Sequence, residues 1–258
     1  MNIFFTICGR AGSKGFQNKN LKEMNGAPLV YYTLAAICLY KNLHQEDLIT
    51  IAVNTDSQEL KGLVRSQQAM DEIVFMDRKE ELSADEVPKV DVIKDTYLSF
   101  KGNTDWDVIV DLDITSPLRR IADIENALAV YNNSKFDLVC SVVKARRNPY
   151  FNMVEIKDDG SYRKVCESVY TARQQAPICY ELNGSIYAYS PQFLEKEIEK
   201  TILDYNCGIS VMPDYLTLDI DSKEDFEMMQ RLHKYYCSVD LGLKEIYTAA
   251  LNMKRACS

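Results

Sequence analysis

The first group of residues that could do chemistry lies between positions 8 and 20, in the stretch CGRAGSKGFQNKN. The stretch contains three glycines, one serine, one arginine and two lysines. Glycine lets a backbone approach a ligand closely, while cationic side chains and exposed amides can hold the oxygens of phosphate groups. The pattern therefore favours a phosphate-binding loop, although a solvated surface loop would also accept these residue types.

Two well-known glycine-rich phosphate loops do not match this stretch. A dinucleotide-binding fingerprint reads G-x-G-x-x-G, and a P-loop reads G-x-x-x-x-G-K-[ST]. Here Gly9, Gly12 and Gly15 are each three residues apart, and the order is Ser-Lys-Gly. We therefore predict a cradle for a triphosphate that is of a different type.

A second group of residues that could do chemistry lies near the end of the chain. Asp219 and Asp221 stand at i and i+2 in the stretch TLDIDS, so on a strand both carboxylates would point to one face. Two hard oxygen ligands on one side suit Mg²⁺, with phosphate oxygens and water completing the coordination. The alternative is that Asp221 or Ser222 is the N-cap of the following helix. The two roles are compatible, and we predict magnesium binding here.

The elements that must position these residues alternate between strand and helix. Apolar runs predict strands at residues 2–8, 48–55, 72–76, 107–115 and 137–145, with helical spacing between them. Such alternation is typical of βαβ units, so we predict an α/β fold with a doubly wound, mainly parallel, Rossmann-like sheet. Ligands of such sheets bind beyond the carboxyl ends of the strands, and the glycine loop directly follows the first strand.

The alternation breaks after residue 145. The stretch NMVEIKDDGSYRKV (152–165) predicts a β-hairpin around Asp158, Asp159 and Gly160, and residues 183–190 predict a further strand. We therefore expect one domain over residues 1–258 that contains a small antiparallel insertion at about 146–190. A short strand is predicted near residues 207–213, and a long helical pattern begins at Ser222.

Composition narrows the range of partners and compartments. The formal net charge of -8 argues against broad binding to nucleic acid or to an anionic membrane. No stretch approaches the roughly 18 to 20 apolar residues that a membrane-spanning helix needs. The opening MNIFFTICGR also lacks the basic leader of a secretory signal. We expect a cytoplasmic protein that holds a small anionic ligand locally.

The cysteines and histidines give no sign of a zinc site. The eight cysteines include no C-x-x-C pair, and neither His44 nor His233 neighbours a cysteine in the sequence. We expect most of the cysteines to be reduced residues of the core. We expect both histidines to lie at the surface, which argues against a histidine-based catalytic triad.

The stretch GRAGSKGFQNKNLKEMNGAPLVYYTLAA resembles the opening of the acylneuraminate cytidylyltransferases, also called CMP-sialic acid synthetases. Their pattern is A-R-x-x-S-K-G-x-x-x-K-N, followed by G-x-P-L and a helix. Three later stretches resemble the same family in the same order, namely DITSPLR (113–119), ARQQAPICYELNGSIY (172–187) and LDIDSKEDF (218–226). The resemblance therefore covers nearly the whole chain.

The resemblance implies a nucleotidyltransferase. Enzymes of this family join CMP from CTP to a nonulosonic acid, which is a nine-carbon sugar acid, and they release pyrophosphate. The resemblance also implies Mg²⁺ as the cofactor, held by Asp219 and Asp221, and a homodimer formed through the antiparallel insertion. From the acidic net charge we expect no nucleic-acid or membrane partner.

The resemblance assigns catalytic roles at the phosphates to Arg10 and Lys19. The residues implied to bind the nucleotide are Arg10, Gly12, Ser13, Lys14, Lys19, Asn20 and Arg78. Arg78 matches the family segment R-x-x-x-L-x-x-D in a looser register, so a plain surface arginine is the alternative there.

The residues implied to bind the sugar are Asp113, Thr115, Ser116, Arg173, Gln174 and Asn183. An arginine is a natural partner for the carboxylate of the sugar, and the family's dimer would allow Arg173 to act in the neighbouring subunit. Asp113 stands where the sialic acid enzymes usually have glutamine, and Glu181 stands where they often have arginine.

These two departures leave the sugar open. The candidate sugars are a legionaminic-type 5,7-diamino nonulosonate, N-acetylneuraminate and the deaminated relative of N-acetylneuraminate. An ionised carboxylate at position 113 can only accept hydrogen bonds, so its contact with the sugar differs from that of glutamine. The alternatives are a cytidylyltransferase for another sugar acid such as Kdo, an enzyme for another nucleotide, and a catalytically silent sugar-nucleotide-binding protein.

Overall fold

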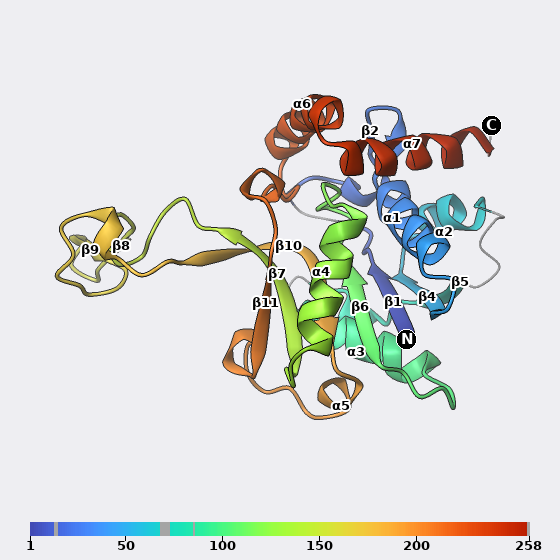
Figure 1. Ribbon diagram of the computed structural model, residues 1–258, viewed down its shortest axis with the longest axis horizontal. Helices are drawn as coiled ribbons and strands as arrows, with labels where there is room; N and C mark the ends of the chain where they lie inside the picture. Colours follow the sequence, from blue (N-terminus) through green and yellow to red (C-terminus); the bar gives the residue numbers. More distant parts are fainter. Residues whose placement is uncertain (13–14, 68–72, 85, 257–258) are drawn as a thin grey trace.

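The computed structural model describes residues 1–12, 15–67, 73–84 and 86–256. Its centre is a seven-stranded sheet with the order β11-β7-β10-β6-β1-β4-β5 (Figure 1). Strand β10 is antiparallel to both β6 and β7, and the other neighbouring strands are parallel. The prediction of a mainly parallel α/β sheet is confirmed. The strands are β1 (Asn2–Cys8), β4 (Leu48–Thr55), β5 (Ile73–Asp77), β6 (Val108–Leu112), β7 (Leu138–Lys144), β10 (Tyr180–Tyr189) and β11 (Cys207–Val211).

Helices cover both faces of this sheet. The larger apolar cluster includes α1 (Leu29–Leu43), α2 (Gln58–Arg65) and α4 (Ile121–Asn132). The smaller cluster includes α3 (Lys89–Phe100) and α5 (Pro191–Leu194). Because both faces are covered, β1 and β6 are almost entirely buried, which explains why their sequences are nearly continuous apolar runs.

The helical pattern after Ser222 forms two helices, α6 (Lys223–Val239) and α7 (Leu241–Ala256), and α7 packs against α1. Ser222 is the N-cap of α6, since its hydroxyl accepts from the Asp225 amide at 3.0 Å and the Asp225 carboxylate accepts from the Ser222 amide at 2.8 Å. The helix is therefore capped by Ser222, which leaves the neighbouring carboxylate of Asp221 available for other contacts.

The prediction that both histidines lie at the surface is wrong for His233. Its side chain is buried between Tyr32 and Tyr247, and its Nδ1 accepts from the Asn25 amide at 2.9 Å. Burial lowers the pKa of His233 to about 4. The polar appearance of α6 misled the prediction, because α7 follows α6 and supplies Tyr247 to the pocket around the ring. His44 is partly exposed and lies 2.9 Å from Glu125.

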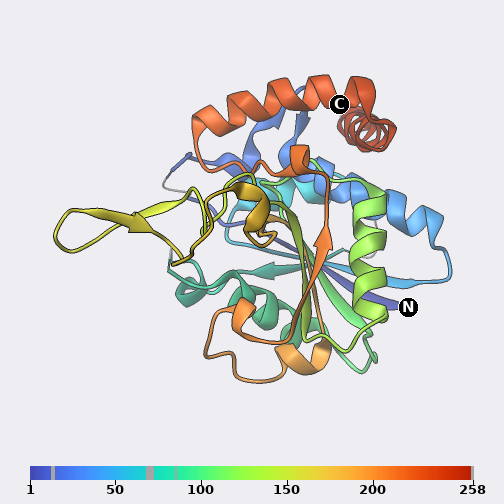
Figure 2. The ribbon, with the colours of Figure 1, turned by 60° about the vertical axis from the view of Figure 1, so that its left-hand side comes forward.

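A two-stranded hairpin of β8 (Val154–Ile156) and β9 (Tyr162–Lys164) projects from the body between β7 and β10 (Figures 1 and 2). We call the segment from residue 145 to residue 179 the arm. Strand β10, which we expected to be part of the insertion, pairs with β6 and β7 in the main sheet. It does so because its apolar residues, such as Ile186 and Ala188, continue the buried interior.

Smaller elements complete the structure. Strands β2 (Glu23–Met24) and β3 (Ala27–Pro28) form a separate small hairpin before α1.

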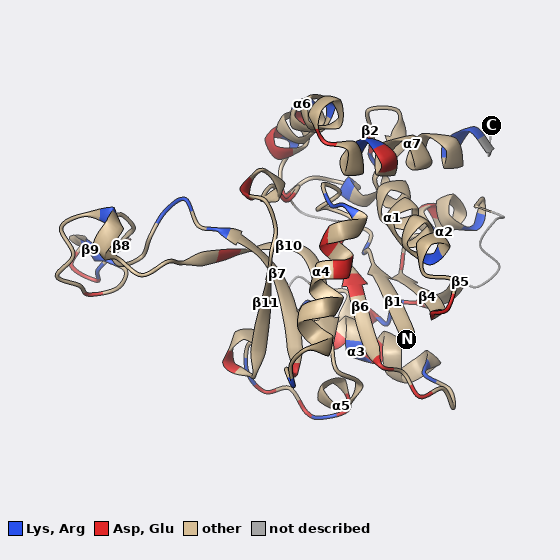
Figure 3. Ribbon diagram, viewed as in Figure 1, with Lys and Arg blue, Asp and Glu red and all other residues tan. Residues whose placement is uncertain are grey.

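Charged residues of both signs are interspersed along the ribbon in the view of Figure 3. In the described ranges, no helix has both the length and the apolar character that crossing a membrane requires. The cysteines in those ranges form no disulfide, and Cys8, Cys140 and Cys237 are buried.

Candidate active site

A cleft of about 390 Å³ lies beyond the carboxyl ends of β1 and β6. One part of its lining is apolar and includes Val87 and Val92, whereas the rest is strongly polar. The structure brings together in this lining several residues that the sequence predicts to be functional, namely Arg10, Lys19, Asn20, Arg78, Asp113, Thr115 and Asp221.

The glycine loop runs along one side of the cleft. Gly12 has a φ of +70°, which a side chain would strain. At Gly15 an added Cβ would lie 2.7 Å from the backbone oxygen of Asp221, so only glycine permits this close approach. Ser13 and Lys14 lie outside the described residues.

Hydrogen bonds fix the predicted nucleotide-binding residues around the cleft. The Asn20 amide donates to the backbone oxygen of Arg10 at 3.1 Å. The guanidinium of Arg10 donates to the backbone oxygen of Ser83 at 3.3 Å. From the facing side, Arg78 Nε donates to Asn54 Oδ1 at 2.9 Å, at the end of β4. Two arginines from different segments therefore face one cleft, which favours an anionic ligand.

Lys19 connects the glycine loop to the segment that contains the two predicted metal ligands. Its Nζ donates to the backbone oxygen of Ile220 at 2.9 Å and to Asp221 Oδ1 at 3.0 Å. The Ile220 amide in turn donates to the backbone oxygen of Thr115 at 3.1 Å. Segments about 100 and 200 residues from the glycine loop are thereby joined to it.

Asp219 and Asp221 lie in an extended segment that belongs to no strand. The Asp221 side chain is 79% exposed, whereas Asp219 is half-buried and accepts from the Ile220 amide at 2.8 Å. Burial, followed by the negative charge of Asp113, raises the pKa of Asp219 despite the opposing effects of Thr115 and Lys19. The charged form of Asp219 is therefore disfavoured mainly by burial.

A cation bound beside Asp219 would offset this cost of burial. Among the described residues, no group of three or more His, Cys, Asp or Glu side chains could by itself enclose a metal ion. Two carboxylates beside a cleft suit Mg²⁺, because magnesium usually keeps several waters and takes further oxygens from substrate phosphates. The donor set therefore fits the predicted metal, and Asp219 and Asp221 would be its protein ligands.

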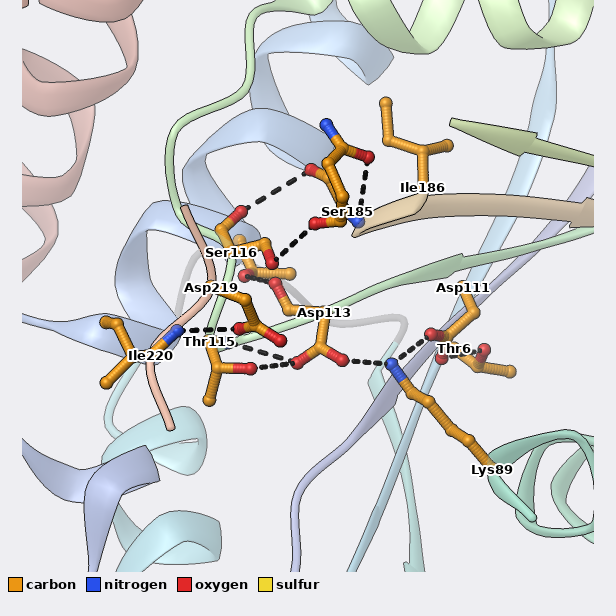
Figure 4. A network of polar contacts seen from close by, with 12 residues as sticks. Thr6, Lys89, Asp111, Asp113, Thr115, Ser116, Ser185, Ile186, Asp219 and Ile220 are labelled. Carbon is orange, nitrogen blue, oxygen red and sulfur yellow. Dashed lines mark hydrogen bonds and ion pairs between the residues drawn. The ribbon is translucent and has the colours of Figure 1, made fainter. Parts of the chain in front are cut away.

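The floor of the cleft contains an ion cluster that sequence reasoning missed in part (Figure 4). Lys89 Nζ lies 2.6 Å from Asp111 Oδ2 and 2.5 Å from Asp113 Oδ2. Asp113 Oδ1 also accepts from the amide and the hydroxyl of Thr115, at 3.0 and 2.9 Å. A lysine in the first turn of a helix is usually a surface residue, so only the unusual position of Asp111 inside an apolar strand could have signalled the cluster.

The remaining residues predicted to bind the sugar lie elsewhere. Ser116 is buried, and its hydroxyl donates to the backbone oxygen of Asn183 at 3.1 Å. The buried amide of Asn183 accepts from Ser141 at 2.6 Å and donates to the backbone oxygen of Leu216 at 3.1 Å. These two residues hold the polypeptide behind the cleft. Arg173 and Gln174 lie in the arm and do not line the cleft of their own chain.

Two solved structures with a similar fold carry the titles of a synthetase and a synthase. A structure titled CMP:2-keto-3-deoxy-manno-octonic acid synthetase complexed with CTP has a TM-score of 0.64 at 15% identity, covering 91% of this chain and 99% of that one. The 4-diphosphocytidyl-2C-methyl-D-erythritol synthase of Anaerococcus prevotii has a TM-score of 0.57, also at 15% identity, covering 90% of this chain and 98% of that one. The chain therefore shares the α/β fold of these two structures.

Comparisons of the sequence identify the family more narrowly than the fold does. The family model described as cytidylyltransferase matches residues 5–241, and the chain belongs to that family. It is 33% identical over 89% of its length to a CMP-N,N'-diacetyllegionaminic acid synthase of Campylobacter jejuni, of which the match covers 94%. It is 32% identical over 90% of its length to the post-translational flagellin modification protein B of Campylobacter coli, of which it covers 95%. It is 27% identical over 85% of its length to an N-acylneuraminate cytidylyltransferase of Streptococcus agalactiae, of which it covers half.

The close approach at Gly15 leads to a prediction about nucleotide binding. In Gly15→Ala the added methyl group must push the glycine loop away from Asp221, and Lys19 moves with the loop. We expect the affinity for CTP, measured by isothermal titration calorimetry, to fall at least ~10-fold, which corresponds to about 1.4 kcal/mol. Gly62→Ala on α2 is the matched control, because its added Cβ would meet nothing within 4 Å. Equal CTP affinities in the two variants would contradict this account of the loop.

Proposed function

We propose that the protein transfers the cytidylyl group of CTP to the anomeric hydroxyl of a nonulosonic acid and releases pyrophosphate. The observation that carries the proposal is the single cleft in which Arg10, Lys19 and Arg78 face the carboxylates of Asp113 and Asp221. Membership of the cytidylyltransferase family supports the nucleotide. The relatives that act on legionaminic or neuraminic acids support the acceptor.

In this reaction the sugar hydroxyl attacks the α-phosphorus of CTP and loses its proton. The new phosphorus–oxygen bond forms as the bond to pyrophosphate breaks, and pyrophosphate leaves with the electron pair of that bond. The reaction needs alignment and charge stabilisation more than a protein nucleophile. Arg10 and Lys19 suit this task, because both are held rigidly in the cleft by hydrogen bonds to backbone oxygens.

In the proposal, Asp219 and Asp221 hold Mg²⁺. When bound, magnesium neutralises the triphosphate and orients its oxygens. Lys19 contributes at the same place, since it already contacts Asp221 and carries a positive charge towards the cleft. The glycine loop and the segment that contains the two carboxylates would thus bind the same triphosphate from two sides.

The acceptor that we propose to test first is a legionaminic-type 5,7-diamino nonulosonate. The Campylobacter coli flagellin modification protein and the Campylobacter jejuni legionaminic acid synthase match over nearly their full length at 32% and 33% identity. A legionaminic acid synthase of Legionella pneumophila also matches over 96% of its length, at 25% identity. The neuraminate-specific relative matches at 27% over half of its length. The substitution of Asp113 for glutamine agrees with a changed sugar contact, because a carboxylate accepts hydrogen bonds where an amide can also donate them.

The function is tested by incubating the protein with CTP and a panel of nonulosonic acids while following pyrophosphate release. We expect turnover with CTP and with at least one N-acylated nonulosonate. The comparison reactions use each of the other three nucleoside triphosphates in place of CTP, and Kdo in place of the nonulosonic acid. Strong turnover with UTP, GTP or Kdo and none with CTP and a nonulosonate would contradict the proposal.

The metal proposal predicts that Asp219→Ala and Asp221→Ala each reduce turnover by roughly 100-fold or more, since a bound metal contributes several kcal/mol of charge stabilisation. EDTA should abolish wild-type turnover, and added Mg²⁺ should restore it. Asp214→Ala is the control variant, because Asp214 forms only an exposed ion pair with Arg146. Circular dichroism checks that the folds are retained. Near-normal rates in both cleft variants would remove the metal assignment.

We propose also that two chains form a homodimer through the arm. Five of the apolar side chains of the arm are more than half exposed, namely Val154 (64%), Ile156 (67%), Tyr162 (70%), Val169 (92%) and Ile178 (65%). An isolated two-stranded hairpin is marginally stable in water, so this arm needs a covering surface. The exposed sheet residues Leu182 and Val211, which flank buried Val142 on neighbouring strands, extend the apolar surface into the body.

Such a dimer would place Arg173 and Gln174 beside the cleft of the partner subunit. We expect Ile156→Lys to give a monomer in size-exclusion chromatography with light scattering, whereas Leu241→Lys, at a residue that is 81% exposed on the body, should remain a dimer. Co-expressed Lys19→Ala and Arg173→Ala chains should be more active together than either variant alone, because one mixed site would retain both side chains. A wild-type monomer would refute the dimer.

The location in the cytoplasm stays a prediction. It is supported by cysteines such as Cys140 and Cys207, whose sulfur atoms lie 3.6 Å apart as thiols. A compartment that keeps thiols reduced suits this arrangement.

A further inference from the structure

The cluster of Lys89, Asp111 and Asp113 extends from the interior of the sheet to the floor of the cleft. Asp111 lies within β6 and is fully buried, whereas the side chains of Asp113 and Lys89 are 20% and 32% exposed. Lys89 lines the cleft together with Asp113 and Thr115. Figure 4 shows the ammonium group of Lys89 between the two carboxylates.

Neutralising Asp111 alone does not account for this arrangement. A buried carboxylate needs hydrogen bonds and a counter-charge, and Asp111 has both, from the Thr6 hydroxyl at 2.8 Å and from Lys89. Lys89 nevertheless contacts Asp113 at the same short distance, 2.5 Å against 2.6 Å. Lys89 is also the first residue of α3, where the helix dipole disfavours a cation. The short contact with Asp113 and the unfavourable place in the helix both indicate that Lys89 is positioned to contact Asp113 as well as Asp111.

Three donors fix the carboxylate of Asp113 in one orientation. Thr115 donates twice to Oδ1, and Lys89 donates to Oδ2. Burial by itself raises the pKa of Asp113, but the charge and hydrogen bond of Lys89 and the two bonds from Thr115 together lower it to about 2. A carboxylate offers roughly four lone-pair sites, so one acceptor site on Oδ2 is left for a ligand in the cleft.

We propose that Lys89 is a positioning residue that holds the Asp113 carboxylate charged and oriented, so that the cleft selects a substrate with an O–H or N–H donor at this point. The inference rests on the proposed function and deepens it. The donor is a hydroxyl or an N-acyl amide of the sugar acid, or a ribose hydroxyl of CTP, and both offer the same chemistry to Oδ2.

The test is steady-state kinetics of Lys89→Met and Lys89→Arg, with CTP and the sugar acid varied separately. Lys89→Met should raise the KM of the substrate that contacts Asp113 by about 10- to 100-fold, the range for a hydrogen bond to a charged group. The KM of the other substrate should stay nearly unchanged. Lys89→Arg should restore most of the loss, because it keeps the positive charge beside Asp113.

Two sets of measurements identify the substrate that supplies the donor. If it is the sugar acid, its KM rises, and removal of the donating hydroxyl or amide costs less in Lys89→Met than in the wild-type protein. If it is the ribose, the KM of CTP rises, and the variant loses discrimination against 2′-deoxy-CTP or 3′-deoxy-CTP. Either result supports the proposal.

A second series of variants guards against a folding defect, because Lys89→Met leaves Asp111 buried without a cation. In this series every variant also carries Asp111→Asn, which removes the unpaired charge. Lys89→Met and Asp113→Asn are then made singly and together. If Lys89 acts through Asp113, the combined variant should have the same KM as the variant with Asp113→Asn alone.

Lys79→Met is the matched control, since Lys79 pairs at the surface with Asp95 of α3, the helix that begins at Lys89, and its loss should leave both KM values unchanged. The proposal is overturned if Lys89→Met in the Asp111→Asn series lowers only thermal stability or kcat, or if its effect on KM adds fully to that of Asp113→Asn. If the wild-type protein turns over no nonulosonate with CTP, the proposed function fails instead. Affinities for CTP and the sugar acids, measured by calorimetry, then replace the KM values in the same comparisons.

Discussion

Balance of charge at the carboxyl edge of the sheet is the constraint on which the cleft depends. Carboxylates from β6 and from the segment before α6 meet cations from the glycine loop and from the start of α3. A buried charge is costly alone, and Asp111, Asp113 and Asp221 each have a lysine partner from a distant part of the chain. Among the described residues Asp219 has no such partner, and burial raises its pKa.

The same contacts that balance charge also set the shape of the cleft. Lys19 and the Ile220 amide hold three segments together through backbone oxygens, and Gly15 allows two of them to touch. Transfer of a nucleotidyl group needs groups that are already aligned when the substrate binds. A cleft whose cations are fixed by backbone contacts meets that need, whereas cations on a free loop would have to be ordered at each turnover.

Much of the cleft could be predicted because its signals are local. Arg10, Lys19 and Asn20 stand within one short stretch after an apolar strand, and all three line the cleft in the structure. The pairing of Lys89 with Asp113 was missed, since 24 residues separate them and the one local signal was a carboxylate, Asp111, inside the apolar strand β6. His233 was misjudged for a related reason, because the rings that bury it belong to other helices.

The sequence by itself determined the alternation of strands and helices, the glycine-rich and cationic composition of the first loop and the resemblance to a family of cytidylyltransferases. These properties follow from residue type and spacing along the chain, which act over a few residues. Only the tertiary structure decided that Ser116 and Asn183 lie behind the cleft and that Arg173 lies away from it. It also decided that Lys89 forms an ion pair with Asp113 on the cleft floor. Those outcomes depend on which side chains meet across the sheet, and long-range packing alone sets that.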